Sequence, residues 1–261
     1  MAQFHSGGLT LAYDDIAPAG EVAGTVVLVH GFATNRAENW RRLGWLGAFE
    51  RKGWRTVALD LRGHGESDKP HDPEAYGRAA MAGDILALMD HLGLSRADLM
   101  GYSMGAHLAL GLSLSDPDRI GHLILGGVGR RVLDGGGPIA EARMTMAQAL
   151  RAPDIAAIDD PTLKGFRQFA VNQGEDLEAL AACSEGAGRA VTADDLARIT
   201  APTVVIAGSA DTLAGDPQPL ADAIPGAKCV SLAACDHFTA IPHALFKAAV
   251  FDFLEGWLDE M

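Results

Sequence analysis

The first half of the chain alternates between two patterns of hydrophobic positions. Short β-branched runs such as Thr25–Val29 are apolar at every position, which favours strands covered on both faces. Between these runs, apolar residues recur at helical spacing, as with Leu43, Leu46 and Phe49. Strands that alternate with helices through short connections predict right-handed crossovers and a parallel sheet.

The same patterns give the predicted order of elements. The segment Phe4–Asp14, interrupted by Gly7 and Gly8, predicts an antiparallel hairpin. Further strands are predicted at Thr25–Val29, Arg55–Asp60, Ala97–Tyr102, His122–Gly126, Thr203–Ala207 and Lys228–Leu232. Helices are predicted at Asn35–Lys52, Ala75–Leu92, Met104–Leu114 and Pro242–Trp257. On the second of these helices, Asp84 and Asp90 are expected to face solvent.

This alternation stops between about Gly129 and Thr200. A glycine-rich loop, Gly135–Pro138, begins the segment, and no strand candidate follows. Helical stretches are predicted at Ala140–Leu150, Asp154–Ile158, Pro161–Gln173, Asp176–Cys183 and Ala193–Ile199. We interpret residues 131–200 as a small helical cap or lid inserted after the sixth strand. Residues 1–130 and 201–261 then form an α/β core with a mostly parallel central sheet flanked by helices.

Composition and charge narrow the class of partner. Of the 261 residues, 48% are hydrophobic and 21% charged, as in ordinary globular proteins. A formal net charge of −13 disfavours nucleic acid and anionic membrane surfaces. No apolar run is long enough to cross a bilayer, and Met1–Tyr13 lacks the pattern of a signal peptide. We therefore expect a cytoplasmic monomer or homodimer that acts on a small molecule.

The three cysteines point to neither a disulfide framework nor a metal site. Cys183, Cys229 and Cys235 are odd in number and lack metal-ligand spacing. We expect reduced thiols, no metal and no cofactor.

A candidate nucleophile lies between a predicted strand and a predicted helix, in the sequence Gly101-Tyr102-Ser103-Met104-Gly105. This is the context of a nucleophile elbow, a turn so sharp that the residues flanking the serine must be very small. Glycines at both flanks remove the Cβ atoms that would collide. The pattern predicts that the Ser103 hydroxyl is exposed at the tip of the turn.

A serine hydroxyl needs a base, and the base needs a carboxylate that orients it. Among nine histidines, only His237 follows the elbow and lies on the loop between the last predicted strand and the final predicted helix, so it is the candidate base. Asp211 directly follows the strand Thr203–Ala207 and is the preferred carboxylate. Asp236, adjacent to His237, and Asp216, further along the loop of Asp211, are the alternatives.

Acyl transfer also requires donors for a developing oxyanion. The backbone amide of Met104 is one candidate, and the amide of Phe32 in His30-Gly31-Phe32 is the other. Phe32, Tyr102 and Phe238 are expected to contact substrate. Arg130 is a candidate partner for a substrate carboxylate. Apolar residues of the insertion are expected mainly to pack the cap itself: Ile139, Met144, Met146, Phe166 and Phe169.

Taken in order, these motifs resemble the α/β-hydrolase fold superfamily over nearly the whole chain. The matching segments are His30-Gly31-Phe32, Asp60–Ser67, the Ser103 elbow, the Asp211 turn and His237. The resemblance implies that Asp60–Ser67 is a structural turn beside the site. Related haloalkane dehalogenases and epoxide hydrolases carry aspartate where this chain has Ser103, so those activities are not expected.

The predicted function is a serine hydrolase that cleaves a carboxylic ester, thioester or lactone of a small to medium, largely apolar acyl group through an acyl-enzyme on Ser103. Several alternatives remain open. The fold also serves carbon–carbon bond hydrolases and enol-lactonases of acidic ring-cleavage products, cofactor-free perhydrolases and acyltransferases. A ligand-binding receptor without catalysis is the alternative from a different class.

Overall fold

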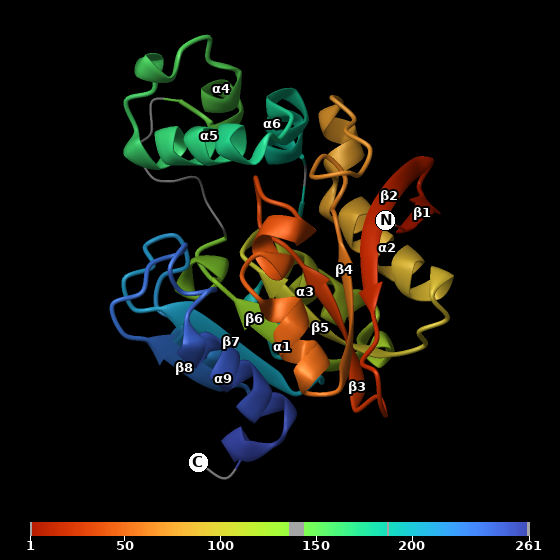
Figure 1. Ribbon diagram of the computed structural model, residues 1–261. Helices are drawn as coiled ribbons and strands as arrows, with labels where there is room; N and C mark the ends of the chain where they lie inside the picture. The colour runs from red at the N-terminus through yellow and green to blue at the C-terminus, as the bar shows by residue number, and fades with distance from the viewer. Residues whose placement is uncertain (1, 136–143, 187, 260–261) are drawn as a thin grey trace.

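A computed structural model describes residues 2–135, 144–186 and 188–259. Its centre is an eight-stranded sheet with the strand order β1-β2-β4-β3-β5-β6-β7-β8 (Figure 1). The strands are β1 (Ala2–Ser6), β2 (Leu9–Ile16), β3 (Gly24–Val29), β4 (Trp54–Leu59), β5 (Ala97–Tyr102), β6 (Ile120–Gly126), β7 (Thr203–Gly208) and β8 (Lys228–Leu232).

The direction of the strands confirms the predicted fold class. β1 and β2 form the antiparallel hairpin, and β2 also runs antiparallel to β4. From β4 to β8 all neighbouring strands are parallel. In β3, Val26 and Leu28 contribute to one buried cluster while Val27 and Val29 contribute to another. Neither face of such a strand meets solvent, so apolar residues do not alternate with polar ones, and residues 26–29 are apolar throughout.

Helices cover both faces of this sheet (Figure 1). One face carries α1 (Trp45–Arg51) and α9 (Ala244–Leu254), whose aromatic side chains pack together. The Trp45 and Phe246 ring centroids are 5.7 Å apart. The other face carries α2 (Arg78–His91), α3 (Met104–Ser115) and α8 (Gln218–Asp222). No helix in the described ranges is long and apolar enough to cross a membrane.

Two sequence predictions about helices were wrong. The predicted helix Asn35–Lys52 is a π-helical turn, Ala37–Arg41, followed by α1. Gly44, at φ +75°, separates the two because a left-handed residue ends the first segment. Asp84 does not face solvent: it is fully buried and forms a bidentate ion pair with Arg62, with both N–O distances 2.7 Å. A buried carboxylate is tolerated when such a pair satisfies it.

A helical layer follows β6 and lies over the edge of the sheet at which β3 and β5 end (Figure 1). It contains α4 (Met146–Arg151), α5 (Pro161–Gln173) and α6 (Leu177–Glu185). The predicted helix Ala140–Leu150 lies partly outside the described residues. Of the other two predicted helices, one is a 3-10 turn, Ile155–Ala157, and the other is shortened to α7 (Ala193–Leu196).

Glu175, in the turn between α5 and α6, connects this helical layer to the core. Its carboxylate accepts hydrogen bonds from the Asn35 side chain at 2.8 Å and from the Gly65 amide at 2.9 Å. Burial raises the pKa of Glu175 above its ordinary value. The hydrogen bonds place the end of α5 beside the loop that follows β3.

Candidate active site

The elbow around Ser103 has the strained backbone that its glycines predict. Ser103 lies between β5 and α3 with φ +53° and ψ −114°. A Cβ atom on Gly101 would collide with the Gly105 carbonyl, and one on Gly105 with the Val29 carbonyl. The Ser103 amide donates to the Gly126 carbonyl at 2.8 Å. A residue in this region costs about 1–3 kcal/mol, so the surrounding packing must hold it there.

Three side chains predicted to act together lie in one hydrogen-bonded chain. His237 Nε2 is 3.0 Å from Ser103 Oγ, and His237 Nδ1 is 2.8 Å from Asp211 Oδ2. The Asp211 side chain is 0% exposed and that of His237 8%. Because the carboxylate can only accept, Nδ1 carries the proton and donates it to Asp211. Nε2 is then free to accept the Ser103 proton.

Asp211 is held in place by its own turn, and the alternative carboxylates are engaged elsewhere. Asp211 Oδ1 accepts from the amides of Leu213 and Ala214 at 3.0 and 2.9 Å. Asp236 accepts from the amides of Phe238 and Thr239 and from the Thr239 hydroxyl. These hydrogen bonds, chiefly the one from the Thr239 hydroxyl, lower the pKa of Asp236. Asp216 accepts from the Gln218 amide.

Tyr102 holds the loop of His237 through a hydrogen bond and a ring contact. Its hydroxyl donates to the His237 carbonyl, and the two ring centroids are 5.4 Å apart. Burial, followed by the negative charge of Asp211, raises the pKa of Tyr102 well above its ordinary value. The side chain therefore stays a neutral phenol that positions the loop of His237.

The His30-Gly31-Phe32 loop is fixed by a short network of hydrogen bonds. His30 Nε2 accepts from the Leu61 amide at 3.0 Å, so Nδ1 carries the proton and donates to the Gly31 carbonyl at 2.7 Å. The Gly31 amide donates to Asn39 Oδ1 at 3.2 Å. Within the described ranges, the amides of Phe32 and Met104 donate to no protein acceptor. Both amides are available to a ligand beside Ser103.

Two buried histidines, one in this loop and one beside it, predict that the free energy of unfolding falls in mild acid. Burial lowers the pKa of His30 to about 4 and that of His64 to about 3. Both lie below the unfolded value near 6.5, so the unfolded chain binds protons first as pH falls. We expect the unfolding free energy to be highest above pH 6.5 and to fall between pH 6.5 and 4.

Urea unfolding at successive pH values measures this dependence. In the His64→Gln variant the slope should become shallower by about 1 kcal/mol per pH unit in that window, because one fewer proton is taken up. Equal slopes for both proteins would mean that His64 titrates normally in the folded state.

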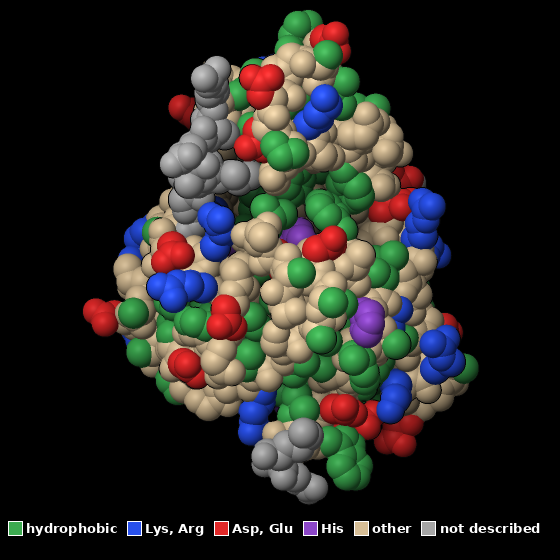
Figure 2. All heavy atoms as spheres, turned by 90° about the vertical axis from the view of Figure 1, so that its left-hand side faces the viewer, with side chains coloured by type: hydrophobic (Ala, Val, Ile, Leu, Met, Phe, Trp, Pro, Cys, Tyr) green, Lys and Arg blue, Asp and Glu red, His purple; other side chains and the backbone are tan. Residues whose placement is uncertain are grey.

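A pocket of about 300 Å³ opens beside Ser103 and His237. Figure 2 shows hydrophobic side chains gathered around a hollow between the helical layer and the body of the molecule. One end of the pocket is aromatic, with Phe32 and Phe166 at a centroid distance of 6.1 Å. Phe238, which is 49% exposed, packs at a tilt against Phe166 and Phe169 at this end, with centroid distances of 6.0 and 5.6 Å.

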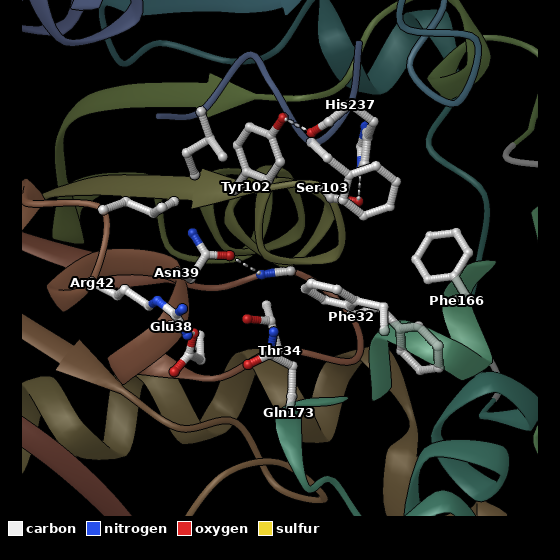
Figure 3. A pocket seen from close by; sticks show the side chains of 15 residues that line it. Phe32, Thr34, Glu38, Asn39, Arg42, Tyr102, Ser103, Phe166, Gln173 and His237 are labelled. Atoms are coloured by element: carbon white, nitrogen blue, oxygen red, sulfur yellow. Dashed lines mark hydrogen bonds and ion pairs between the residues drawn. The ribbon is translucent and has the colours of Figure 1, made fainter. Parts of the chain in front are cut away.

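The other end of the pocket is polar (Figure 3). Its lining residues come from the loop after β3, the π-helical turn and the end of α5: Thr34, Glu38, Asn39, Arg42 and Gln173. No sequence motif points to any of these five residues. Their only signal was position, since four of them follow His30-Gly31-Phe32 within a dozen residues.

The structure places the remaining predicted contact residues as follows. Phe32, Tyr102 and Phe238 line the pocket, together with Phe166 and Phe169 from α5. Arg130 does not line it: its side chain is exposed, and its amide donates to the Asp216 carbonyl at 2.8 Å. Arg130 therefore lies outside this pocket. Ile139 lies outside the described residues.

A metal has no evident place in this site. Across the described ranges, no three His, Cys, Asp or Glu side chains are grouped so that they could hold a metal ion. Cys183, Cys229 and Cys235 are free thiols.

The chain matches known hydrolases in sequence and structure. Epoxide hydrolase 3 of Siraitia grosvenorii is 37% identical over 100 residues, which cover 38% of this chain and only 30% of that protein. The 2-hydroxymuconate semialdehyde hydrolase of Pseudomonas sp. strain CF600 is 31% identical over 220 residues, 78% of this chain and 77% of that protein. The crystal structure of the enol-lactonase from Burkholderia xenovorans LB400 superposes with a TM-score of 0.76 at 26% identity, covering 97% of this chain and 100% of that one.

A family model agrees with these relatives. The model described as alpha/beta hydrolase fold matches residues 24–192. That range includes the His30-Gly31-Phe32 loop, the Ser103 elbow and the helical layer above them, while Asp211 and His237 follow it. With its sheet order, elbow and relatives, the chain belongs to the alpha/beta-hydrolase family of enzymes.

Proposed function

We propose that this protein is a serine hydrolase that cleaves a carboxylic ester, thioester or lactone through an acyl-enzyme on Ser103. The observation that carries the proposal is the hydrogen-bonded chain from Asp211 through His237 to Ser103, which opens into a pocket. A relative of this kind with aspartate at the elbow would attack an epoxide carbon, whereas a serine hydroxyl with an adjacent base attacks a carbonyl.

The reaction has two matching halves. Ser103 Oγ attacks the substrate carbonyl while His237 Nε2 takes the hydroxyl proton, and Asp211 stabilises the imidazolium that forms. The amides of Phe32 and Met104 stabilise the oxyanion. His237 then gives the proton to the leaving group. Water attacks the acyl-enzyme with His237 as base, which releases the acid and restores Ser103.

Residues 131–200 act as the cap in this proposal. Helix α5 contributes Phe166, Phe169 and Gln173 to the pocket, so the helical layer forms part of its wall. A roof of this kind excludes water and strengthens the electrostatic interactions beneath it.

A carbon–carbon bond hydrolase or enol-lactonase is the second candidate. It is favoured by the similarity to 2-hydroxymuconate semialdehyde hydrolase over 78% of this chain and to an enol-lactonase over 97%. The same serine, histidine and oxyanion donors would serve either reaction. A panel of lactones and vinylogous diketones separates these candidates from a simple esterase.

Hydrolysis of p-nitrophenyl acetate, butyrate and octanoate tests the proposal directly. We expect turnover of the short esters, with a decline for octanoate because the pocket holds only about 300 Å³. A fluorophosphonate probe should label Ser103. If the protein neither turns over any ester nor reacts with the probe, a ligand-binding protein without catalysis becomes the better reading.

A further inference from the structure

The polar end of the pocket contains a cation that is already neutralised. Arg42 Nη1 lies 2.9 Å from Glu38 Oε2, an ion pair one helical turn apart, and both residues line the pocket (Figure 3). Arg42 is the only Lys or Arg among the described lining residues. A substrate carboxylate that approached Arg42 would also approach the Glu38 carboxylate. Like charges at that distance repel, so the pair offers an anion little net attraction.

Two neighbouring arginine side chains are also occupied by protein acceptors. The buried Arg36 pairs with Asp60, Glu66 and Asp14. Arg167, on α5, donates to the carbonyls of Ala149 and Leu150. The formal net charge of −13 adds a long-range field that further disfavours anions. Among the described residues that line the pocket, no Lys or Arg side chain is therefore left without a carboxylate partner.

Two neutral polar side chains at the same end are free to bind. Thr34 is 6% exposed and lines the pocket, yet its hydroxyl makes no hydrogen bond within the described part of the chain. The Gln173 amide, from α5, lines the same end of the pocket and likewise makes no hydrogen bond to the described residues (Figure 3). The Thr34 hydroxyl is not one of the fully buried unpartnered polar atoms, so it is accessible, and a ligand oxygen or N–H could form a hydrogen bond with it.

We infer that the substrate of this pocket is an uncharged ester, thioester or lactone with a second, neutral polar group that binds Thr34 and Gln173. Amide, hydroxyl and ketone groups meet this requirement, and a carboxylate in the same position is disfavoured. The inference rests on the proposed function for Ser103 as the site of attack. It separates this protein from hydrolases of acidic ring-cleavage products, although the fold and the elbow are shared.

Binding to the Ser103→Ala protein tests the charge preference without requiring turnover. The probes are 6-oxoheptanamide, 6-oxoheptanoate and an alkyl methyl ketone of equal length, measured by isothermal titration calorimetry. We expect the amide to bind at least about fivefold more tightly than the carboxylate, the range that exposed charge pairs and single hydrogen bonds support. Equal or tighter binding of the carboxylate would overturn the inference.

Variants of the polar end identify the cause of the preference. Thr34→Val removes the hydroxyl at constant shape and should weaken the amide by about fivefold, with less effect on the alkyl ketone. Glu38→Gln leaves Arg42 unpaired and should strengthen the carboxylate by about fivefold at low salt and less at high salt. Arg130→Gln, outside the pocket, is the matched control and should leave all three affinities unchanged. Unaltered amide binding in Thr34→Val would contradict the role of Thr34.

Turnover keeps the two proposals distinguishable. The wild-type protein is assayed with the p-nitrophenyl monoesters of adipic acid and of adipamic acid, which differ only in a carboxylate or an amide. Faster hydrolysis of the adipamic ester supports both proposals. If neither ester reacts but Ser103→Ala prefers the amide ligand, the hydrolase proposal fails and only the preference of the pocket for a neutral ligand stands. If both react and the adipic ester is preferred, the hydrolase stands and the inference fails.

Discussion

Replacement of Ser103 by alanine is expected to lower kcat by on the order of 10³-fold or more. The alanine cannot attack the carbonyl, while the amides of Phe32 and Met104 and the pocket remain. The residual rate should therefore reflect substrate binding and oxyanion stabilisation alone. Steady-state hydrolysis of p-nitrophenyl butyrate by both proteins measures the effect.

The same variant should keep its fold. Alanine is no larger than serine, and the φ of +53° at this position strains both residues alike. Circular dichroism and urea unfolding of Ser103→Ala should therefore match the wild type. A folded variant with undiminished kcat would show that another residue is the nucleophile.

Asp211→Asn is expected to lower kcat by about 10³- to 10⁴-fold, with little change in the fold. The asparagine can still accept from the amides of Leu213 and Ala214 through Oδ1. Its NH₂ group would face His237 Nδ1 in place of the carboxylate oxygen. This forces the proton onto Nε2, so the imidazole can no longer accept the Ser103 proton.

Asp236→Asn is the matched control, because Asp236 is adjacent to His237 in the chain. Its Oδ1 caps the turn at Phe238 and Thr239, and asparagine preserves that acceptor. We expect activity within about twofold of wild type, as for a surface substitution away from the reacting groups. A large loss in Asp236→Asn together with an active Asp211→Asn would assign the orienting carboxylate to Asp236 instead.

Much of the fold and the site could be read from local patterns in the chain. A strand buried on both faces must be apolar throughout, so β3 and β7 were predictable from their own residues. The elbow was predictable for a similar reason, since only glycine fits at Gly101 and Gly105. The carboxyl ends of parallel strands meet at one edge of a sheet. Residues that follow β5, β7 and β8 could therefore be expected to lie together.

Other features depend on contacts between segments far apart in the chain. Asp84 has a helical position that suggests solvent, and only the packing of α2 against the turn after β4 buries it beside Arg62. Residues 35–52 have the periodicity of one helix, but Gly44 divides them into two segments.

The pocket is the clearest case of this dependence. Thr34 and Gln173 line the same pocket because Glu175 ties the end of α5 to Asn35 and Gly65, whereas Arg130 lies outside it. Periodicity and motifs were enough to predict the candidate reacting groups, because their local geometry is built into single strands and turns. The residues that surround the substrate depend on how the helical layer packs against the core. No local sequence pattern encodes that packing, because it joins segments far apart in the chain.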